Sequence, residues 1–479
     1  MSAASVPATE LLSQFVHQAK FADLPPQVVD RTLIHILDVL GCVAVGTKLP
    51  WIDQVRRYAL EAGRTGASTV VGGSPLVAEW AAFANATAAH GFELDDYHSG
   101  ALSHPGCVVI PTVLAIAEEA GSSGPDIVLA CALGLETIVR IGLATSPSMV
   151  VDRGIHETCV QGVFGAAVAA GKLLGLDTKA LISALGIAGS HASGTREYAH
   201  SGGEVKRLHA GLGAMGGIRG AVLTKRGLQG PTRILEGARG VIQAFADKHD
   251  VGEIVRDLGH EWRFLGCGIK PYASCGVIHA PTDALVELVR ENGLTVDAID
   301  EIVVGVDRLS MEHVGSLPLQ PADMNGAQFN LPYSLGMALT VGGNAFSHYW
   351  RLQESNFRND AVVAAARKVR MVIDEEVNHA FPETLMSRVR VKRCDGRWFE
   401  KTARPRGSKD RPLSLTEVQE KFRDLVGETA WTAQAPAIEK AVQALRTGAR
   451  ASDLMKLLAT NAGGKTQDRS TKLRIGAAF

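Results

Sequence analysis

The sequence predicts a mainly α-helical protein: a large all-helical domain that is discontinuous in the chain, plus a smaller α+β domain. Three observations predict this class. Apolar residues recur at helical spacing from Thr9 to about Phe264, β-branched runs of alternating polarity appear only beyond about residue 268, and helical spacing returns after about residue 409. With 479 residues, 46% of them apolar, the chain is long enough for two or three domains.

The first helices are predicted from apolar stripes, and the later ones from runs of small residues. Glycine is unusually abundant, at 51 of 479 residues, while aromatic residues make up only 5%. Each helical glycine costs roughly 1 kcal/mol, so close packing of helix axes must offset that cost. The stripes are Leu12, Phe15, Val16, Ala19 and Leu33, Ile36, Leu37, Leu40; the small-residue segments are 108–120, 126–143, 158–174, 180–189 and 211–224.

The α+β domain is predicted between about residues 268 and 408. Strands are expected at 301–306, 386–392 and 397–402, the last following an Asp-Gly turn at 395–396. Helices are expected at 279–291, 331–340 and 360–369, and again at 415–425 and 437–445. The predicted domains are therefore 1–267 (helical), 268–408 (α+β) and 409–462 (returning helical segment), followed by a polar, flexible tail at 463–479.

Composition excludes several classes of protein. With 49 Lys and Arg against 50 Asp and Glu, the chain lacks the basic excess of a nucleic-acid-binding protein. Its seven scattered cysteines have no CxxC spacing, which favours a reducing compartment over a zinc or redox motif. The N-terminal segment lacks the pattern of a signal peptide, and we expect no membrane span. A cytoplasmic location is the simplest expectation.

Two clusters of ionisable side chains stand between helical segments. The first, residues 90–106, contains three histidines and three acidic residues in a short connection, which is more than a solvated loop requires. Helix capping is the structural alternative, and metal binding is a functional one; however, no HExxH-like spacing is present, so we predict no metal. The second cluster, residues 190–209, includes Arg196, Lys206 and Arg207, and a surface connection is its structural alternative.

A GxGxxG match follows the second cluster, at Gly211, Gly213 and Gly216. A dinucleotide site needs a buried strand directly before the first glycine, and here the preceding residues are Glu-Val-Lys-Arg-Leu-His-Ala. The glycines therefore indicate helix packing.

A third cluster, Lys270-Pro-Tyr272-Ala-Ser-Cys275, opens the α+β domain. Proline at position 271 disfavours a helical Lys270, so this lysine is expected in an extended connection between the domains, where ligand pockets often lie. Cys275 could be a nucleophile, but a buried structural thiol fits the sequence better.

In this order, the clusters resemble the MmgE/PrpD family of 2-methylcitrate dehydratases, cis-aconitate decarboxylases and iminodisuccinate epimerases. Five ordered segments between about residues 8 and 460 carry the resemblance: HGFELDDYH with the following SHPG, GIHETCVQGVFGAAVAAGKLLGLD, EVKRLHAGLGAMGGIRGAVLTKRGLQGP, KPYASCGVIH and AQFNLPYSLGMAL. The resemblance implies that the α+β domain is a lid on the helical domain. It also implies a homodimer and catalysis without a metal or an organic cofactor.

The resemblance also implies which side chains act. Lysines can stabilise the negative charge that builds on a substrate carboxylate, and histidines can transfer a proton near neutral pH. Asp95 would orient His104, and Tyr333 would donate to a leaving oxygen. The expected catalytic residues are Asp95, His104, His156, Lys206, Lys270 and Tyr333; the expected substrate-binding residues are Tyr97, Lys206, Arg207, Lys270, Tyr272 and Cys275.

The reaction expected first is dehydration of a 2-methylcitrate-like hydroxy-polycarboxylate by a cofactor-independent lyase. Epimerisation of a small dicarboxylate such as iminodisuccinate is the alternative, and decarboxylation of a cis-aconitate-like substrate is another. Tyr97 stands where the decarboxylase pattern has Thr, and His104 is shifted by one residue. Both departures favour a reaction other than decarboxylation.

Overall fold

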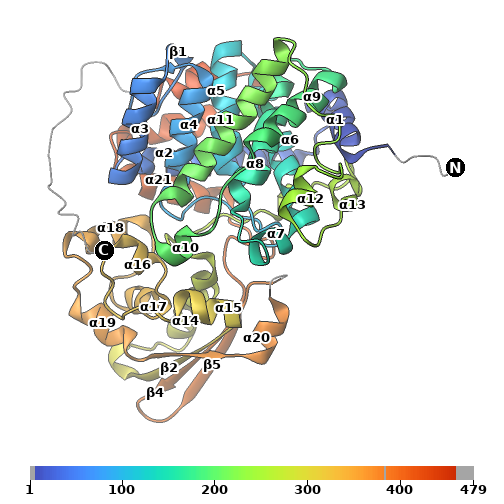
Figure 1. The fold of residues 1–479 in the computed structure, drawn as a ribbon. Helices are drawn as coiled ribbons and strands as arrows, with labels where there is room; N and C mark the ends of the chain where they lie inside the picture. Colours follow the sequence, from blue (N-terminus) through green and yellow to red (C-terminus); the bar gives the residue numbers. More distant parts are fainter. Residues whose placement is uncertain (1–5, 382–383, 460–479) are drawn as a thin grey trace.

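The computed structural model describes residues 6–381 and 384–459 and shows a helical domain with a smaller domain beneath it (Figure 1). The predicted tail at 463–479 lies outside the described residues. The helical domain begins with α1 Ala8–Gln18, α2 Pro26–Gly46, α3 Pro50–Ala62, β1 Thr65–Ser68, α4 Ala78–Ala89, α5 Gly106–Ala120 and α6 Gly124–Thr145. It continues with α7 Ser148–Val151, α8 Glu157–Leu173, α9 Thr178–Ala188, α10 Tyr198–Ser201, α11 Val205–Lys225, α12 Val241–Phe245 and α13 Gly252–Val255.

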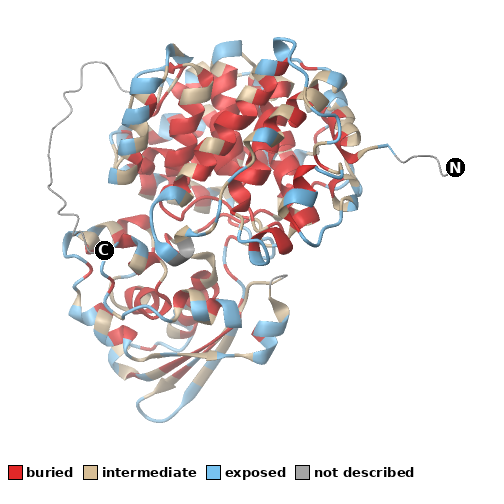
Figure 2. Cartoon of the chain, in the orientation of Figure 1, coloured by how far each residue is buried: buried red, intermediate tan, exposed pale blue. Residues whose placement is uncertain are grey.

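Small residues pack the centre of this domain, where α8 contacts both α6 and α11. A methyl group added at Gly217 of α11 would overlap Ala166 and come within 2.6 Å of the backbone nitrogen of Ala167. Gly165 of α8 faces Gly134 of α6 just as closely, with 2.7 Å between an added methyl group and the Gly134 carbonyl oxygen. Figure 2 shows the buried residues running through these helices. The abundant glycine therefore serves helix packing, and the GxGxxG match lies inside α11 with no strand before it.

The chain returns to the helical domain after the smaller domain, with α21 Leu415–Gly427, α22 Ala435–Ala444 and α23 Ala451–Met455. Helix α21 packs against α2, although nearly 400 residues separate them in sequence (Figure 1). A buried ion pair joins the two helices, with Lys421 Nζ 2.6 Å from Asp38 Oδ1. Lys421 also donates to the Leu94 carbonyl oxygen at 2.7 Å. The returning segment thus holds the connection that follows α4.

The smaller domain is a four-stranded sheet covered by helices. Strand order is β3-β2-β4-β5; β2 is parallel to β3, and the other neighbours are antiparallel. The strands are β2 Ile299–Val306, β3 Val369–Ile373, β4 Ser387–Arg393 and β5 Trp398–Ala403. The helices are α14 His279–Glu291, α15 Arg308–Val314, α16 Met324–Gln328, α17 Leu331–Thr340, α18 Phe346–Glu354, α19 Asp360–Ala366 and α20 Glu375–Ala380. Helix α14 packs on β4 and β5.

The predicted class, mainly helical with a smaller α+β domain, is confirmed. Strand β3 was not predicted: the segment expected as a helix at 360–369 ends at Ala366, and Val369 starts β3. This strand pairs in parallel with β2, so the partner that stabilises it lies about 65 residues away. Local periodicity carries no information on such a distant pairing.

Helix α6 is, within the described residues, long and apolar enough to cross a membrane. However, 94% of its most apolar window is buried inside the protein. It contacts α8, α5 and α2, as expected of the central helix of a packed domain.

We predict that Gly217→Ala destabilises the protein, because the added methyl group overlaps backbone and side-chain atoms of α8. Overpacking of this kind costs about 1–3 kcal/mol. The matched control is Gly427→Ala at the end of α21, where an added methyl group meets no atom within 4 Å. Thermal unfolding of the two variants tests the prediction; equal midpoints would contradict it.

Candidate active site

The connection between α4 and α5, residues 90–105, carries a dense group of buried ionisable side chains: His90, Glu93, Asp95 and Asp96. Asp96 fixes its far end, because the Gly106 backbone N–H at the start of α5 donates to both Asp96 carboxylate oxygens, at 2.9 and 3.1 Å. Gly106 has no room for a side chain, since a methyl group there would lie 2.7 Å from Asp96 Oδ1. Asp96 is therefore a helix-capping residue, and the groups before it are free for other roles.

Glu93 is the central anion of the site. Its carboxylate accepts a short hydrogen bond from Lys206 of α11 and lies 3.4 Å from Lys270 Nζ. Burial opposes its ionisation, but the two lysines outweigh that effect and hold the pKa of Glu93 well below its usual range. Its backbone φ of 57° is unusual for a residue with a side chain. A buried carboxylate in this conformation that holds two lysines together is typical of a functional site.

Lys270 reaches this carboxylate from the connection between the two domains. Gly268 pairs with Tyr97 through two backbone hydrogen bonds, at 2.7 and 3.0 Å, and Ile269 donates to the Gly407 carbonyl oxygen at 2.8 Å. The two chain crossings between the domains thus lie side by side. As expected from Pro271, Lys270 is outside any helix. It is only 2% exposed, so its ammonium group faces the interior.

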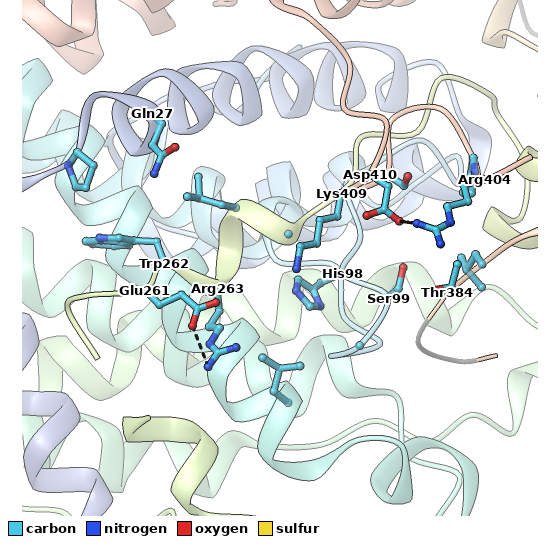
Figure 3. Close-up of a pocket in the computed structure, with 18 of the residues that line it drawn as sticks. Gln27, His98, Ser99, Glu261, Trp262, Arg263, Thr384, Arg404, Lys409 and Asp410 are labelled. Atoms are coloured by element: carbon cyan, nitrogen blue, oxygen red, sulfur yellow. Dashed lines mark hydrogen bonds and ion pairs between the residues drawn. The ribbon is translucent and has the colours of Figure 1, made fainter. Parts of the chain in front are cut away.

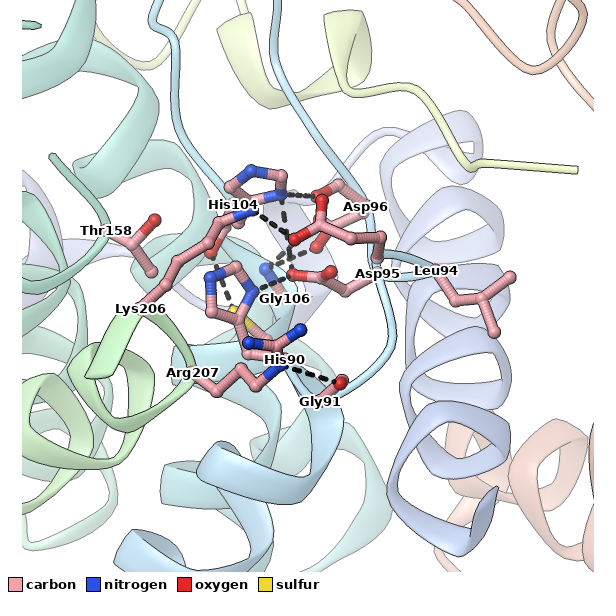
Figure 4. Close-up of polar contacts among 12 residues, drawn as sticks. His90, Gly91, Leu94, Asp95, Asp96, His104, Gly106, Thr158, Lys206 and Arg207 are labelled. Atoms are coloured by element: carbon pink, nitrogen blue, oxygen red, sulfur yellow. Dashed lines mark hydrogen bonds and ion pairs between the residues drawn. The ribbon is translucent and has the colours of Figure 1, made fainter. Parts of the chain in front are cut away.

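Three histidines, His90, His104 and His156, lie close to Asp95. Figure 4 shows two of them, His90 and His104, around the Asp95 carboxylate. Asp95 Oδ2 lies 2.6 Å from His90 Nδ1 and 3.4 Å from His104 Nδ1. His90 stacks on His156, with ring centroids 5.7 Å apart. Burial opposes the ionisation of Asp95, but His90 and His104 outweigh it and lower the pKa of this carboxyl.

The tautomer of His104 follows from its neighbours. Its Nδ1 lies 2.8 Å from the Asp96 carbonyl oxygen and 3.4 Å from Asp95 Oδ2, both of which can only accept. The ring therefore carries its proton on Nδ1, leaving the Nε2 lone pair available as a base. Burial lowers the pKa of His104 to about 4, with Asp95 opposing and Lys270 adding to the effect. His104 is neutral at physiological pH in the empty site.

His156 is held neutral in the same way. Its Nδ1 lies 2.8 Å from His209 Nδ1, so one ring donates and the other accepts. Burial, followed by the neighbouring His90, lowers the pKa of His156 well below the ordinary value. Burial also lowers the pKa of His209 to about 4. Two neutral imidazoles, His104 and His156, therefore line the site.

These groups surround a cavity of about 440 Å³ between the helical domain and the smaller domain. From the helical domain it is lined by Glu93, Tyr97, His98, Ser99, Leu102, Ser103, His104, Pro147, Val150, Val151, His156, Glu157, Arg196, Tyr198 and Lys206. From the connection and the smaller domain it is lined by Lys270, Cys275, Gly276, Val277, Leu309, Ser310, His313, Phe329, Phe381 and Leu385. A small anion with several carboxylates matches both the size and the cations of this cavity.

A second cavity, of about 660 Å³, opens at the same boundary between the domains (Figure 3). His98, Ser99 and Leu385 line both cavities, so the second adjoins the first. Its arginines are paired with carboxylates: Arg263 with Glu261 at 3.1 Å, and Arg404 with Asp410 at 2.7 Å. The cavity of 440 Å³ is thus the one with concentrated acid–base groups.

Comparison with known families agrees with this architecture. The model of the MmgE/PrpD N-terminal domain matches residues 10–254, and that of the MmgE/PrpD C-terminal domain matches residues 272–447. The chain belongs to the MmgE/PrpD family. The resemblance inferred from the five motifs is confirmed, and Lys270 lies in the stretch between the two matched ranges.

Relatives within the MmgE/PrpD family match nearly the whole chain. A cis-aconitate decarboxylase of Aspergillus terreus (strain NIH 2624 / FGSC A1156) is 31% identical over 91% of this chain and 92% of its own. The cis-aconitate decarboxylase-like protein oryM of Aspergillus oryzae is 30% identical over 94% of this chain and 97% of its own length. A cis-aconitate decarboxylase of Mus musculus is 26% identical over 98% of this chain and 96% of its own length.

Most residues predicted for the MmgE/PrpD site lie at the cavity. His104, His156, Lys206 and Lys270 line it together with Tyr97 and Cys275, and Asp95 lies behind His104. Burial raises the pKa of Cys275, which keeps it a thiol and fits a structural role.

Three predicted residues lie elsewhere. The Tyr333 hydroxyl donates to the Phe357 carbonyl oxygen at 3.1 Å within the core, and the Tyr272 hydroxyl donates to Asp283 at 2.6 Å. Neither lines the 440 Å³ cavity, so these hydroxyls hold structure where we expected contact with substrate. Arg207 donates to the Gly91 carbonyl oxygen at 3.1 Å and lines a neighbouring cavity.

Sequence reasoning singled out the first cluster but did not assign roles to His90 and Glu93. It also missed Glu157, which lines the cavity directly after His156. The signal for Glu93 was its place among the acidic and histidine residues of that cluster. Nothing in the sequence marks Glu157 beyond its position next to a predicted catalytic histidine.

Among the described residues, one buried group could hold a metal ion: His90, Asp95 and Cys107, whose ligand atoms lie within 4.8 Å of one another. His90 Nδ1 is already bound to Asp95 at 2.6 Å. Burial raises the pKa of Cys107 well above its usual value, which disfavours the thiolate that a metal prefers. We assign these residues to positioning of His104.

We predict that acid destabilises this protein from about pH 6.5 downward. Burial lowers the pKa of His98, His104 and His209 to about 4 each. The unfolded chain binds these protons near pH 6.5, so the stability present above that pH is lost as the pH falls toward 4. For each histidine, a pKa difference of one unit between the folded and unfolded chain changes the free energy of unfolding by about 1.4 kcal/mol.

The prediction is tested by measuring the unfolding temperature between about pH 7.5 and pH 4.5. This range covers most of the interval between the histidine pKa of the unfolded chain, about 6.5, and that of the folded chain. In His98→Asn the amide oxygen can still accept from the Ala101 N–H, as His98 Nδ1 does at 3.0 Å, but the titration is removed. Its unfolding temperature should depend less on pH than that of the wild type. The exposed His249→Asn is the control; the same pH dependence in both variants would contradict the assignment.

Proposed function

We propose that this protein is a lyase that acts next to a carboxylate of a small polycarboxylate substrate. The observation that carries the proposal is the pairing of Lys206 and Lys270 around Glu93 at a cavity that also presents the neutral base His104. Two lysines against one carboxylate leave positive charge, and Arg196 adds to it. Fixed cations in a buried site stabilise charge that develops on a substrate carboxylate.

Decarboxylation of a cis-aconitate-like substrate is the reaction we propose first. The relatives that match nearly the whole chain are named for this activity. We give their names more weight than Tyr97 and the spacing of His104, which favoured dehydration. In this reaction a carbon–carbon bond breaks to release carbon dioxide, and its electron pair forms a new double bond. The electrons of the original double bond take up one proton at the far alkene carbon. Lys206 and Lys270 would hold the carboxylates that remain.

Dehydration of a 2-methylcitrate-like substrate is the second candidate, and the neutral His104 favours it. Removal of water begins with loss of a proton from the carbon beside a carboxylate, which needs a base, whereas decarboxylation needs none. The Nε2 lone pair of His104 offers that base, and Asp95 would steady the imidazolium. Epimerisation of a dicarboxylate uses the same proton abstraction, with proton return on the opposite face.

A homodimer and a cytoplasmic location also belong to this proposal. All seven cysteines are free in the structure, including the exposed Cys394, which suits a reducing compartment. Light scattering of the purified protein at micromolar concentration tests the dimer.

A panel of cis-aconitate, 2-methylcitrate and iminodisuccinate in heavy water tests the reaction class. Decarboxylation releases carbon dioxide and places deuterium on carbon in the product. Dehydration forms an alkene without carbon dioxide, and epimerisation returns inverted, deuterated substrate. Turnover of none of the three would contradict the proposed function.

We predict that Lys206→Ala and Lys270→Ala each lower kcat/KM for the preferred substrate by about 10²- to 10³-fold, because each removes a fixed cation from the cavity. The control is Lys440→Ala, an exposed lysine of α22 outside the cavity. Steady-state kinetics of the three variants, with circular dichroism to verify folding, measure the effect. Normal activity in both cavity variants would show that the site lies elsewhere.

A further inference from the structure

Glu157 brings to the cavity a carboxyl group that the mechanism above does not use. It is the first residue of α8, directly after His156, and it lines the cavity. The residue is 6% exposed. Its Oε2 is buried and has no hydrogen-bond partner among the described residues. A buried carboxylate oxygen without a donor is costly when charged, whereas a protonated carboxyl in this place has a proton to give.

The surroundings of Glu157 favour the protonated form. Burial raises its pKa to about 7, outweighing its own backbone N–H, Arg196 and Lys206, which all favour the anion. Tyr198 of α10 faces it as a neutral phenol, because burial and the carboxylate itself raise the tyrosine pKa. The start of a helix would normally favour an ionised Glu157, so burial is the dominant effect.

Two histidines and the other carboxyl group of the cavity are not in their acidic form at physiological pH. His104 and His156 are neutral at physiological pH, and Glu93 is fully ionised between its two lysines. Two groups whose environments push their pKa values in opposite directions mark an acid and a base of one site. Here the imidazole of His104 is kept unprotonated and the carboxyl of Glu157 is kept protonated.

We propose that Glu157 is the general acid of this cavity and delivers a proton to the substrate; this rests on the proposed lyase function. In decarboxylation, the Glu157 O–H bond breaks and the proton joins the far alkene carbon as carbon dioxide leaves. In dehydration, the same proton joins the departing hydroxyl oxygen to form water, while His104 takes the proton from carbon. Either step leaves Glu157 as a carboxylate, which Arg196 and Lys206 stabilise until solvent returns the proton.

Glu157→Gln tests this role, because the amide keeps the shape of the side chain but has no acidic proton. Loss of a general acid lowers kcat by about 10²- to 10⁴-fold, and we expect KM to change little. In the wild type, kcat/KM should fall as the pH rises through about 7, where Glu157 loses its proton. That fall should be absent from the residual activity of Glu157→Gln, and Glu157→Asp should recover part of kcat. Glu197→Gln, an exposed glutamate outside the cavity, is the control.

Infrared difference spectroscopy of the free enzyme provides a readout that needs no substrate. We expect a protonated-carboxyl band that titrates near neutral pH and is missing in Glu157→Gln. Absence of such a band, or a Glu157→Gln variant with wild-type kcat and an unchanged pH profile, would overturn the assignment. If the wild type turns over no panel substrate, the proposed lyase function fails, while the infrared band still decides whether Glu157 holds the proton.

Discussion

The arrangement of the site depends on one buried interaction, the contact of Glu93 with Lys206 and Lys270. Without the carboxylate, the ammonium groups of Lys206 on α11 and of Lys270 on the connection between the domains would repel each other in a medium of low polarity. Glu93 adopts a positive φ to place its side chain between them, a conformation that costs on the order of 1–3 kcal/mol. Removing one partner from a buried ion pair costs about 3–5 kcal/mol, because the charge that remains is left without compensation.

The close packing of α8 against α11 and α6 forms the core of the helical domain and also positions the histidines of the site. Gly217 and Gly165 let α8 lie close to α11 and α6, which brings His156 at the start of α8 within 2.8 Å of His209 in α11. The same approach excludes water from the imidazoles, and this loss of hydration keeps them neutral. Larger residues in these helices would separate the histidines as well as loosen the core.

The sequence allowed many elements to be predicted, but not the direction of every side chain. Helices α14 and α17 were predicted to the residue, because their apolar periodicity is local. Tyr333 lies in a predicted motif, yet its ring points into the core around Phe357, a neighbour fixed only by the tertiary fold. Glu157 could not be singled out, because the burial that raises its pKa depends on how the chain packs around the start of α8. Asp95 and His104 were predicted together because they are close in sequence.

The bond from Lys421 to the Leu94 carbonyl oxygen has a consequence for biosynthesis. The connection that bears Glu93 and Asp95 leaves the ribosome early, but its anchor on α21 is made more than 300 residues later. The helices of the first half can associate while translation continues, whereas the acid–base groups gain their final support only when α21 reaches α2. The returning segment also completes the hydrophobic core, so the core and the catalytic centre are both finished only near the end of translation.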